Sequence, residues 1–181
     1  VPQRSVVENI VLGYEPRTRL GLIDWRAAEA RTRAVLARFG IDIDISRALG
    51  SYPTAIQQLV AIGRAVSMEA RLLVMDEPTS SLDEREVDVL FAAIRQVRAA
   101  GTAVLYVSHF LDELFRICDG VTILRDGATV GTARMAETTR LDLIAAMLGR
   151  SAESIRAAGR TELGLGMAAT GDVFLKASGL S

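Results

Sequence analysis

The feature that most constrains this chain is the stretch from Leu72 to Asp83, in which four aliphatic residues are followed by Asp76, Glu77 and a proline. An unbroken apolar run of this length indicates a strand buried on both faces, as in parallel sheets. Ligands of open α/β sheets bind beyond the carboxyl ends of the strands. There, one carboxylate can hold a metal ion and the other can take a proton from water. Taken alone, an acidic pair after a strand is more often solvated, and the residues that follow change that balance.

A helix and a second strand follow this acidic pair. Ser81 and Glu84 have the spacing of a capping box, and apolar residues then recur at helical intervals. The strand predicted over residues 102–107 ends at His109, the single histidine of the chain. Because parallel strands end at the same sheet edge, we expect Asp76, Glu77 and His109 to lie along one crevice.

Three amphipathic helices are predicted before this unit. The first is short and has a capping box of Ser5 and Glu8, and the second covers residues 24–39 with Asp24 as its cap. The third begins with Thr54 as its cap and continues to Val66. A helix start presents unpaired N–H groups and can receive a phosphate, although a capped surface helix is the simpler interpretation.

The sequence after the second strand predicts smaller elements. Residues 111–118 form a short helix, and residues 121–132 form a hairpin around an Asp-Gly turn. Residues 141–148 form a further amphipathic helix. Residues 151–171 have the composition of a linker, and residues 172–181 resemble the start of a new strand.

Composition excludes several classes of protein. The chain has 181 residues, is 50% hydrophobic and carries a net charge of -1, so no basic excess indicates a nucleic acid partner. Aromatic residues make up 5%, which also disfavours a base-stacking surface. The single cysteine, Cys118, excludes an internal disulfide. No apolar run approaches the roughly 20 residues that cross a bilayer. Since the chain begins at Val1 without an initiator methionine, we expect a fragment.

Taken in order, these motifs resemble the nucleotide-binding subunit of ABC transporters. Residues 72–77 are similar to the Walker B strand, which implies Asp76 as the Mg²⁺ ligand and Glu77 as the general base. His109 corresponds to the switch histidine that contacts the γ-phosphate. Ser81, Leu82 and Asp83 correspond to the D-loop. The signature that binds the partner's nucleotide corresponds to Tyr52, Pro53, Thr54, Ala55, Ile56 and Gln57.

A finer resemblance is to the first cassette of tandem ATPases that energise bacterial import of sugars such as ribose, galactose and xylose. Residues 7–16, read Val-Glu-Asn-Ile-Val-Leu-Gly-Tyr-Glu-Pro, are close to a segment of those proteins. Residues 148–150 resemble the end of their first cassette, and residues 173–181 resemble the opening strand of their second.

The chain departs from this pattern in two places. No phosphate loop of the form Gly-x-x-x-x-Gly-Lys-Ser/Thr occurs in the sequence, so we expect the chain on its own to bind Mg-ATP weakly and to be inactive. In the signature, Pro53 replaces a serine and Ala55 replaces a glycine. Proline offers neither a hydroxyl nor an N–H, and Thr54 carries the nearest hydroxyl.

The resemblance implies an α/β fold of the P-loop NTPase type without its first strands and phosphate loop. Residues 1–68 would form a helical subdomain and residues 69–150 the carboxyl-terminal part of the ATPase core. The implied function is ATP hydrolysis with Mg²⁺ for import of a solute, in particular a monosaccharide. Implied partners are a second cassette, membrane permease subunits and, indirectly, a periplasmic sugar-binding protein, at the cytoplasmic face of the bacterial inner membrane.

Three alternatives remain open at this point. One is a regulatory module that binds nucleotide without hydrolysis, which the altered signature favours and Asp76, Glu77 and His109 oppose. Another is an ABC ATPase without a membrane partner, although the long inserts or basic segments usual in such proteins do not occur. A metal-dependent hydrolase has the least support, because no further ligands have suitable spacing.

Overall fold

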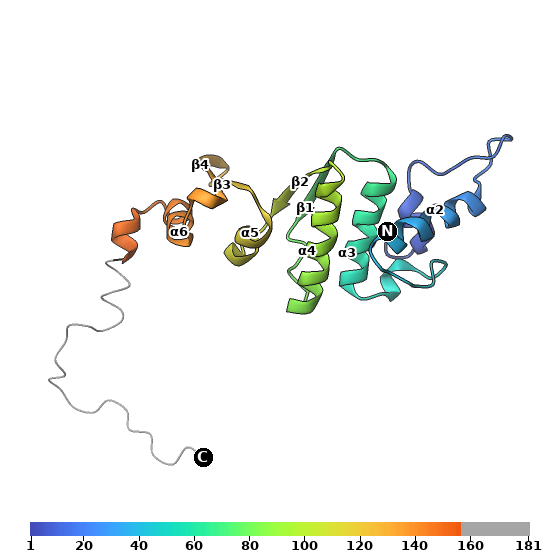
Figure 1. Ribbon diagram of the computed structural model, residues 1–181, viewed down its shortest axis with the longest axis horizontal. Helices are drawn as coiled ribbons and strands as arrows, with labels where there is room; N and C mark the ends of the chain where they lie inside the picture. The colour runs from blue at the N-terminus through green and yellow to red at the C-terminus, as the bar shows by residue number, and fades with distance from the viewer. Residues whose placement is uncertain (157–181) are drawn as a thin grey trace, which may run out of the picture. The chain divides into compact units, whose positions relative to one another are not determined.

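The computed structural model describes residues 1–156, which form an α/β chain in two compact units (Figure 1). The first unit extends from Val1 to Ile117, and the second begins at Cys118. Each unit is described by itself below. The predicted linker and the predicted second cassette lie mostly outside the described residues. No helix among residues 1–156 has the length and apolar character needed to span a membrane.

The elements of the first unit follow the order that the sequence predicts. They are α1 (Val6–Val11), α2 (Trp25–Arg38), the short 3-10 helix η1 (Leu49–Ser51), α3 (Thr54–Ser67), β1 (Leu72–Asp76), α4 (Glu84–Ala99), β2 (Ala103–Val107) and α5 (Leu111–Ile117). The second unit contains β3 (Gly120–Arg125), β4 (Ala128–Arg134), the 3-10 helix η2 (Met135–Glu137) and α6 (Arg140–Leu148).

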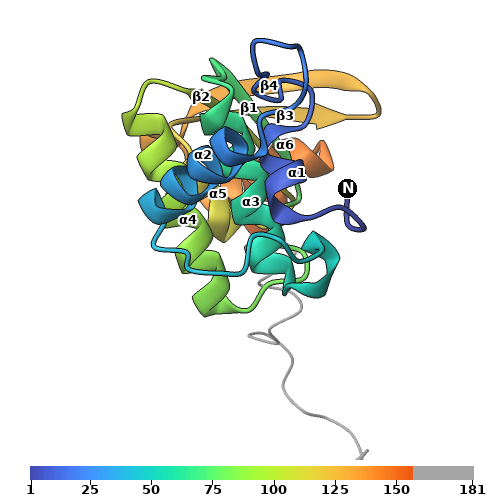
Figure 2. The same cartoon turned by 90° about the vertical axis from the view of Figure 1, so that its right-hand side faces the viewer.

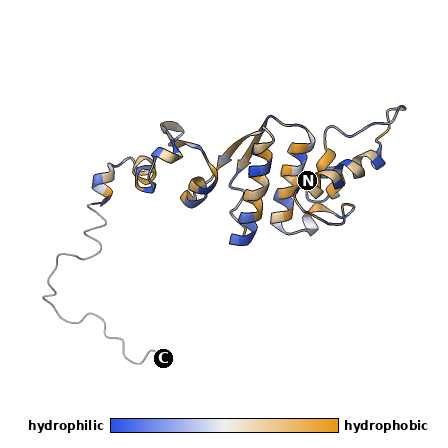
Figure 3. Ribbon diagram, viewed as in Figure 1, coloured by the Kyte–Doolittle hydropathy of each residue, from blue (hydrophilic) through white to orange (hydrophobic). Residues whose placement is uncertain are grey.

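Strands β1 and β2 pair in parallel, with Leu72 opposite Ala103 and Asp76 opposite Val107. Helix α4 connects them, so the predicted β–α–β unit is confirmed. The side chains of Met75 and those of α4 pack together, and Figure 3 shows hydrophobic and hydrophilic residues alternating around α4. Both strands therefore end at one edge of this two-stranded sheet.

One prediction about β1 is wrong for the described residues. The strand is buried on one face only: Leu72, Val74, Leu105 and Val107 are 44–57% exposed, whereas Met75 is buried. Side chains alternate across a strand, and among residues 1–156 only one face of this sheet is packed by helices. A four-residue aliphatic run cannot show whether a second layer covers it.

Helix α3 lies between two hydrophobic cores. One core contains residues of α1 and α2 together with Val60, and the other contains residues of β1 and α4 together with Leu59 and Ile62. Ile56 packs against both. The end-on view of Figure 2 shows α3 behind α1 and α2 in agreement with these contacts. One helix thus joins the amino-terminal helices to the sheet.

Gly63 allows the close approach of α3 to the amino-terminal helices. A Cβ atom built on Gly63 would lie 3.0 Å from a methyl group of Val35 and 3.1 Å from one of Ile10. Both distances are shorter than ordinary carbon–carbon contacts. A glycine in mid-helix costs stability, and here it is retained where three helices meet.

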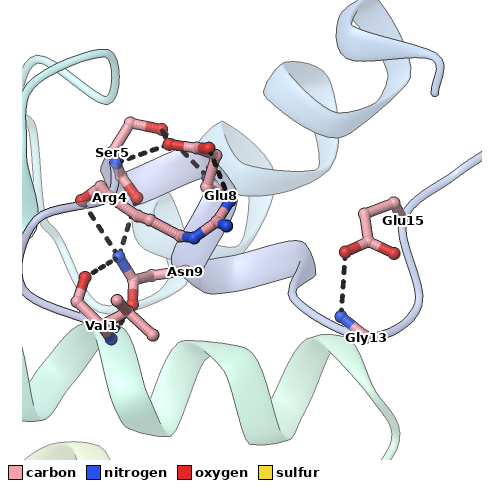
Figure 4. Close-up of polar contacts among 7 residues, drawn as sticks. All are labelled: Val1, Arg4, Ser5, Glu8, Asn9, Gly13 and Glu15. Carbon is pink, nitrogen blue, oxygen red and sulfur yellow. Dashed lines mark hydrogen bonds and ion pairs between the residues drawn. The ribbon is translucent and has the colours of Figure 1, made fainter.

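The capping box predicted for α1 is confirmed. The Ser5 hydroxyl accepts a hydrogen bond from the Glu8 N–H at 3.2 Å, and the Glu8 carboxylate accepts one from the Ser5 N–H at 2.8 Å (Figure 4). The pKa of Glu8 is lowered first by the hydrogen bond from the Ser5 N–H and then by one that the Ser5 hydroxyl donates to the same carboxylate at 3.0 Å. Buried Asn9 donates from its side-chain amide to the carbonyls of Arg4 and Ser5, which fixes the segment that enters the helix.

Two other predicted caps are wrong. Helix α3 begins at Thr54, so Pro53 is its N-cap and no side chain caps it. Helix α4 has its capping box at Asp83 and Glu86 rather than at Ser81 and Glu84. Both pairs have the same spacing, and the extended backbone of Asp83 decides between them.

The second unit is built on the predicted hairpin. Strands β3 and β4 are antiparallel, and the two loop residues, Asp126 and Gly127, have φ of +52° and +76°. Two positive φ values match a type I′ turn, which suits the twist of a two-residue hairpin. Helix α6 packs against this hairpin, and Arg125 donates a hydrogen bond to the Ala146 carbonyl near its end.

Candidate functional site

The carboxyl edge of the β1–β2 sheet carries a carboxylate–imidazole pair. Glu77 Oε1 lies 2.8 Å from His109 Nδ1, and the two residues are separated by 32 positions in sequence. Both side chains are about half exposed, at 47% for Glu77 and 57% for His109. The parallel register of the strands creates this pair, because each residue follows the end of its strand. A molecule arriving at this edge would meet both groups.

The backbone holds Glu77 in an uncommon conformation. Its φ is +43°, in the left-handed region that few residues other than glycine adopt. Its N–H donates to the Val107 carbonyl at 2.9 Å, which extends the parallel ladder one residue beyond β1. Backbone strain of this kind persists only where the surroundings enforce it, and it concentrates at functional sites. The conformation turns the chain sharply after Asp76 and directs the Glu77 carboxylate to His109.

Asp76 is the last residue of β1 and is exposed at the same edge. Its carboxylate is a hard oxygen ligand of the type that Mg²⁺ selects, usually together with water and substrate phosphates. No group of three or more His, Cys, Asp or Glu side chains within residues 1–156 is arranged to hold a metal ion. The chemistry of Asp76 therefore fits a magnesium site that draws its other ligands from water and phosphate.

Behind His109 lies a polar cluster that the sequence interpretation did not include. The buried carboxylate of Glu113 accepts hydrogen bonds from the Tyr106 and Ser108 hydroxyls, each at 2.8 Å. The Ser108 hydroxyl accepts a third bond from the Phe110 N–H at 3.0 Å. These bonds tie both neighbours of His109 to α5 and so position the imidazole. The sequence feature that could have indicated this cluster is the position of Glu113 next to the apolar Leu114 in a short helix, where both side chains are buried.

The predicted D-loop residues have mixed surroundings. Ser81 is exposed, and Leu82 packs at the margin of the α4 core. The Asp83 carboxylate accepts a hydrogen bond from the Glu86 N–H at 2.8 Å as the cap of α4. Asp83 thus has a structural task in this chain, whereas the Ser81 side chain faces solvent.

A shallow groove lies next to this loop. It has a volume of about 290 Å³ and is lined by residues of the loop, of α4 and of α5. Thr79, Leu82, Phe110 and Glu113 are among its lining residues, and Asp76, Glu77 and His109 are not. The pair at the sheet edge therefore lies on an open surface outside this groove.

The six signature-like residues form the entry to α3. Tyr52 is half-buried and donates to the Asp44 carbonyl at 2.7 Å, Ile56 packs against both cores, and the Gln57 amide donates to the Tyr52 carbonyl at 2.9 Å. Pro53 and Thr54 are exposed, and Ala55 is partly exposed. The first turn of α3 presents the Thr54 hydroxyl and unpaired backbone N–H groups to solvent. Pro53 and Thr54 are therefore the members of the six that are most accessible to a ligand.

Several known proteins that are similar to this chain are named as ATP-binding proteins of sugar transport. The chain is 45% identical over 151 residues to the ribose import ATP-binding protein RbsA 1 of Rhizobium meliloti, which covers 83% of the chain and 30% of that protein. It is 44% identical over 181 residues to the arabinose import ATP-binding protein AraG of Ralstonia nicotianae, with 99% and 34% covered. The galactofuranose transporter ATP-binding protein YtfR of Escherichia coli is 39% identical over 165 residues, with 90% and 33% covered.

Solved structures give the same fold. A nucleotide-free ATP-binding cassette from an ABC transporter matches with a TM-score of 0.63 and 20% identity, over 74% of this chain and 56% of that one. The ADP conformation of another ABC transporter cassette, MJ1267, matches with a TM-score of 0.64 and 19% identity, over 86% and 63%. The chain is a homologue of sugar-import ATP-binding proteins and has an ABC ATPase fold. The resemblance inferred from the motifs is therefore confirmed.

Two further facts define the extent of this relationship. No protein-family profile matches the chain. The chain spans about a third of the length of the sugar-import ATP-binding proteins that it matches.

Proposed function

We propose that this chain is part of an ATP-hydrolysing subunit that energises the import of a monosaccharide. The observation that carries the proposal is the contact of Glu77 Oε1 with His109 Nδ1 at 2.8 Å on the carboxyl edge of a parallel sheet. The relatives supply the substrate class, since their names describe import of ribose, arabinose and galactofuranose. The subunit would act from the cytoplasmic face of the bacterial inner membrane as a peripheral protein.

Glu77 has the geometry of a general base. A half-exposed carboxylate can accept a proton from a water that attacks the γ-phosphate, and His109 holds one of its oxygens in place. His109 is exposed enough to contact the γ-phosphate as well, so the pair would sense whether that phosphate is present. Catalysis of this kind depends mainly on positioning and electrostatics.

Asp76 would hold Mg²⁺ through water, next to the base. The metal supplies charge neutralisation at the phosphates when it is bound. The exposed carboxylate of Asp76 lies one residue from Glu77, so ion and base would face the same substrate.

The start of α3 would contact nucleotide held by a second cassette, in the same chain or in a partner chain. Backbone N–H groups of the first turn and the Thr54 hydroxyl are the available donors, since Pro53 supplies neither. Ser81, Leu82 and Asp83 would lie at the same junction, with Ser81 making the direct contact. Residues 1–68 would bear on the permease subunits, and a periplasmic sugar-binding protein would deliver the solute.

The test is Glu77→Gln in the complete protein that contains this chain. We expect ATP hydrolysis to fall by about 10²- to 10⁴-fold, the contribution typical of a general base, while ATP binding stays intact. Steady-state phosphate release and equilibrium nucleotide binding measure the two quantities. Glu69→Gln is the matched control, because Glu69 is also exposed and also has a positive φ, of +52°.

Unchanged hydrolysis in Glu77→Gln would contradict the role of Glu77. If the natural protein also bound ATP without hydrolysing it, the regulatory module would be the better interpretation. An ATPase that never copurifies with a membrane permease would favour the class of ABC ATPases without membrane partners.

A further inference from the structure

The segment between α1 and α2 forms a small hairpin with an unusual tip. Arg17 and Ile23 form an isolated antiparallel bridge, and the Thr18 N–H donates to the Leu22 carbonyl at 2.8 Å. The Gly21 N–H donates to the Thr18 carbonyl at 2.9 Å, so residues 18–21 form a turn with Arg19 and Leu20 at its corners. Figure 1 shows this blue loop reaching away from the helices of its unit.

The tip presents apolar side chains to solvent. Leu20 is 87% exposed and Leu22 is 68% exposed, and Trp25 at the hairpin base is 46% exposed. Single exposed apolar residues are ordinary on protein surfaces. Here three of them lie within six positions, on a segment that is held in shape by its own hydrogen bonds. Neither leucine belongs to a hydrophobic core of the unit.

Cations accompany these leucines. Arg17 donates from its guanidinium to the Gly21 carbonyl at 2.8 Å, which braces the turn and places a positive charge beside it. Arg19 occupies a turn corner, and no hydrogen bond or ion pair of its side chain occurs among the described residues. Two acids flank the hairpin. Glu15 accepts a hydrogen bond from the Gly13 N–H at 3.1 Å (Figure 4) and also interacts electrostatically with Arg17, and Asp24 caps α2. Residues 17–23 themselves carry two guanidinium groups, two exposed leucines and no acidic side chain.

We propose that this hairpin, residues 17–23, inserts its leucines into an anionic lipid bilayer. Guanidinium groups are attracted to anionic headgroups, and leucine and tryptophan side chains transfer favourably to the membrane interface. Within residues 1–68, which we propose to bear on the permease subunits, the hairpin tip is too small to form a protein interface by itself, because a stable interface buries about 800 Å² on each side. The inference goes beyond nucleotide hydrolysis and does not depend on it.

The test is cosedimentation of the full chain with vesicles in the absence of nucleotide. We expect binding to vesicles that contain phosphatidylglycerol and little binding to pure phosphatidylcholine. The chain has a net charge of -1, so general attraction to an anionic surface would not produce this result. We expect Leu20→Asp to reduce the partition coefficient by about tenfold or more.

A matched control comes from the other hairpin of the chain. Leu124 is 70% exposed and precedes Arg125, so Leu124→Asp makes the same chemical change at a similarly exposed leucine. This variant should bind vesicles as the natural chain does. Arg19→Gln should reduce binding to anionic vesicles and leave the far-ultraviolet circular dichroism spectrum unchanged, which keeps the test valid if Leu20→Asp folds poorly.

Trp25 gives an independent readout because it is the single tryptophan of the chain. Lipids brominated on the acyl chain should quench its fluorescence in the natural chain and not in Leu20→Asp. Absence of binding to anionic vesicles would overturn the proposal. Binding that Leu20→Asp leaves unchanged would also overturn it, since charge alone would then explain the adsorption. Loss of ATPase activity in Glu77→Gln would affect neither result.

Discussion

Three structural properties coincide at Glu77. Its φ is positive, its N–H extends the parallel ladder to the Val107 carbonyl, and its side chain contacts His109. The adjacent proline, Pro78, is buried and limits how the chain can leave this turn. The backbone conformation and the contact with His109 together position the carboxylate. Such preorganisation is what a general base requires.

A prediction at the residue scale concerns the charge on Glu8. Because the folded pKa of Glu8 is lowered, its stabilising effect is fully present above the ordinary glutamate pKa and is lost as the pH falls through the lower folded value. We expect Glu8→Gln to reduce the free energy of unfolding at pH 7 by about 0.5–1 kcal/mol, as for other capping residues. Urea unfolding at pH 7 and at pH 3 measures this.

The difference between the natural chain and Glu8→Gln should shrink at the lower pH, because the carboxylate is stabilising only in its charged form and acid favours its protonation. Glu29→Gln is the control, because the Glu29 carboxylate makes only an exposed ion pair with Arg33 at 3.7 Å. A difference that stays the same at pH 3 would show that the charge of Glu8 is not the cause.

At the scale of elements, the close packing at Gly63 gives a second prediction. We expect Gly63→Leu to reduce the free energy of unfolding by about 1–3 kcal/mol through overpacking, although leucine is the better helix former. The methyl groups of Val35 and Ile10 leave no room for the new side chain. Ala61→Leu is the matched control, because Ala61 is exposed on the same helix. Equal stability of the two variants in urea unfolding would contradict the packing argument.

The elements were predictable from the sequence to different degrees. Helical periodicity located α2, α3, α4 and α6, and the Asp-Gly pair located the β3–β4 turn, because each depends on residues close together in the chain. The exact start of α3 could not be predicted. Thr54 has the side chain of a typical cap, but the extended backbone that a cap needs occurs at Pro53. The α4 cap was misplaced by two residues for the same reason.

The site was predictable in part. Adjacent strand ends identified Asp76, Glu77 and His109 as neighbours, and the parallel register places Glu77 against His109. The support from Glu113 was missed, because a buried carboxylate is recognised only when its donors, the Tyr106 and Ser108 hydroxyls, are seen around it. The second task of Asp83, as a helix cap, also depends on local backbone geometry rather than on residue type.

At the scale of the whole molecule, we expect the uncovered face of the β1–β2 sheet to promote dye binding and self-association. Val74 and Leu105 are paired in register and both are about half exposed. We expect the full chain to bind a hydrophobic dye such as ANS and to self-associate through this face. Replacing both residues by threonine should reduce dye binding and association and change the free energy of unfolding by less than about 0.5 kcal/mol.

Val89→Thr is the control for this pair, because Val89 is 50% exposed on α4, away from the sheet face. Light scattering and dye fluorescence report the two effects. If Val89→Thr lowered them as much as the double variant does, the sheet face would not be the cause.

Helix α3 belongs to two cores at once, and this has a consequence for the way the first unit opens. Its amides can exchange with solvent deuterium only when α3 separates from α1 and α2 and from β1 and α4 together. Local opening at either side leaves the helix held by the other. The slowest-exchanging amides of the first unit should therefore lie in the middle of α3, around Val60 and Ile62, rather than in the longer helix α4.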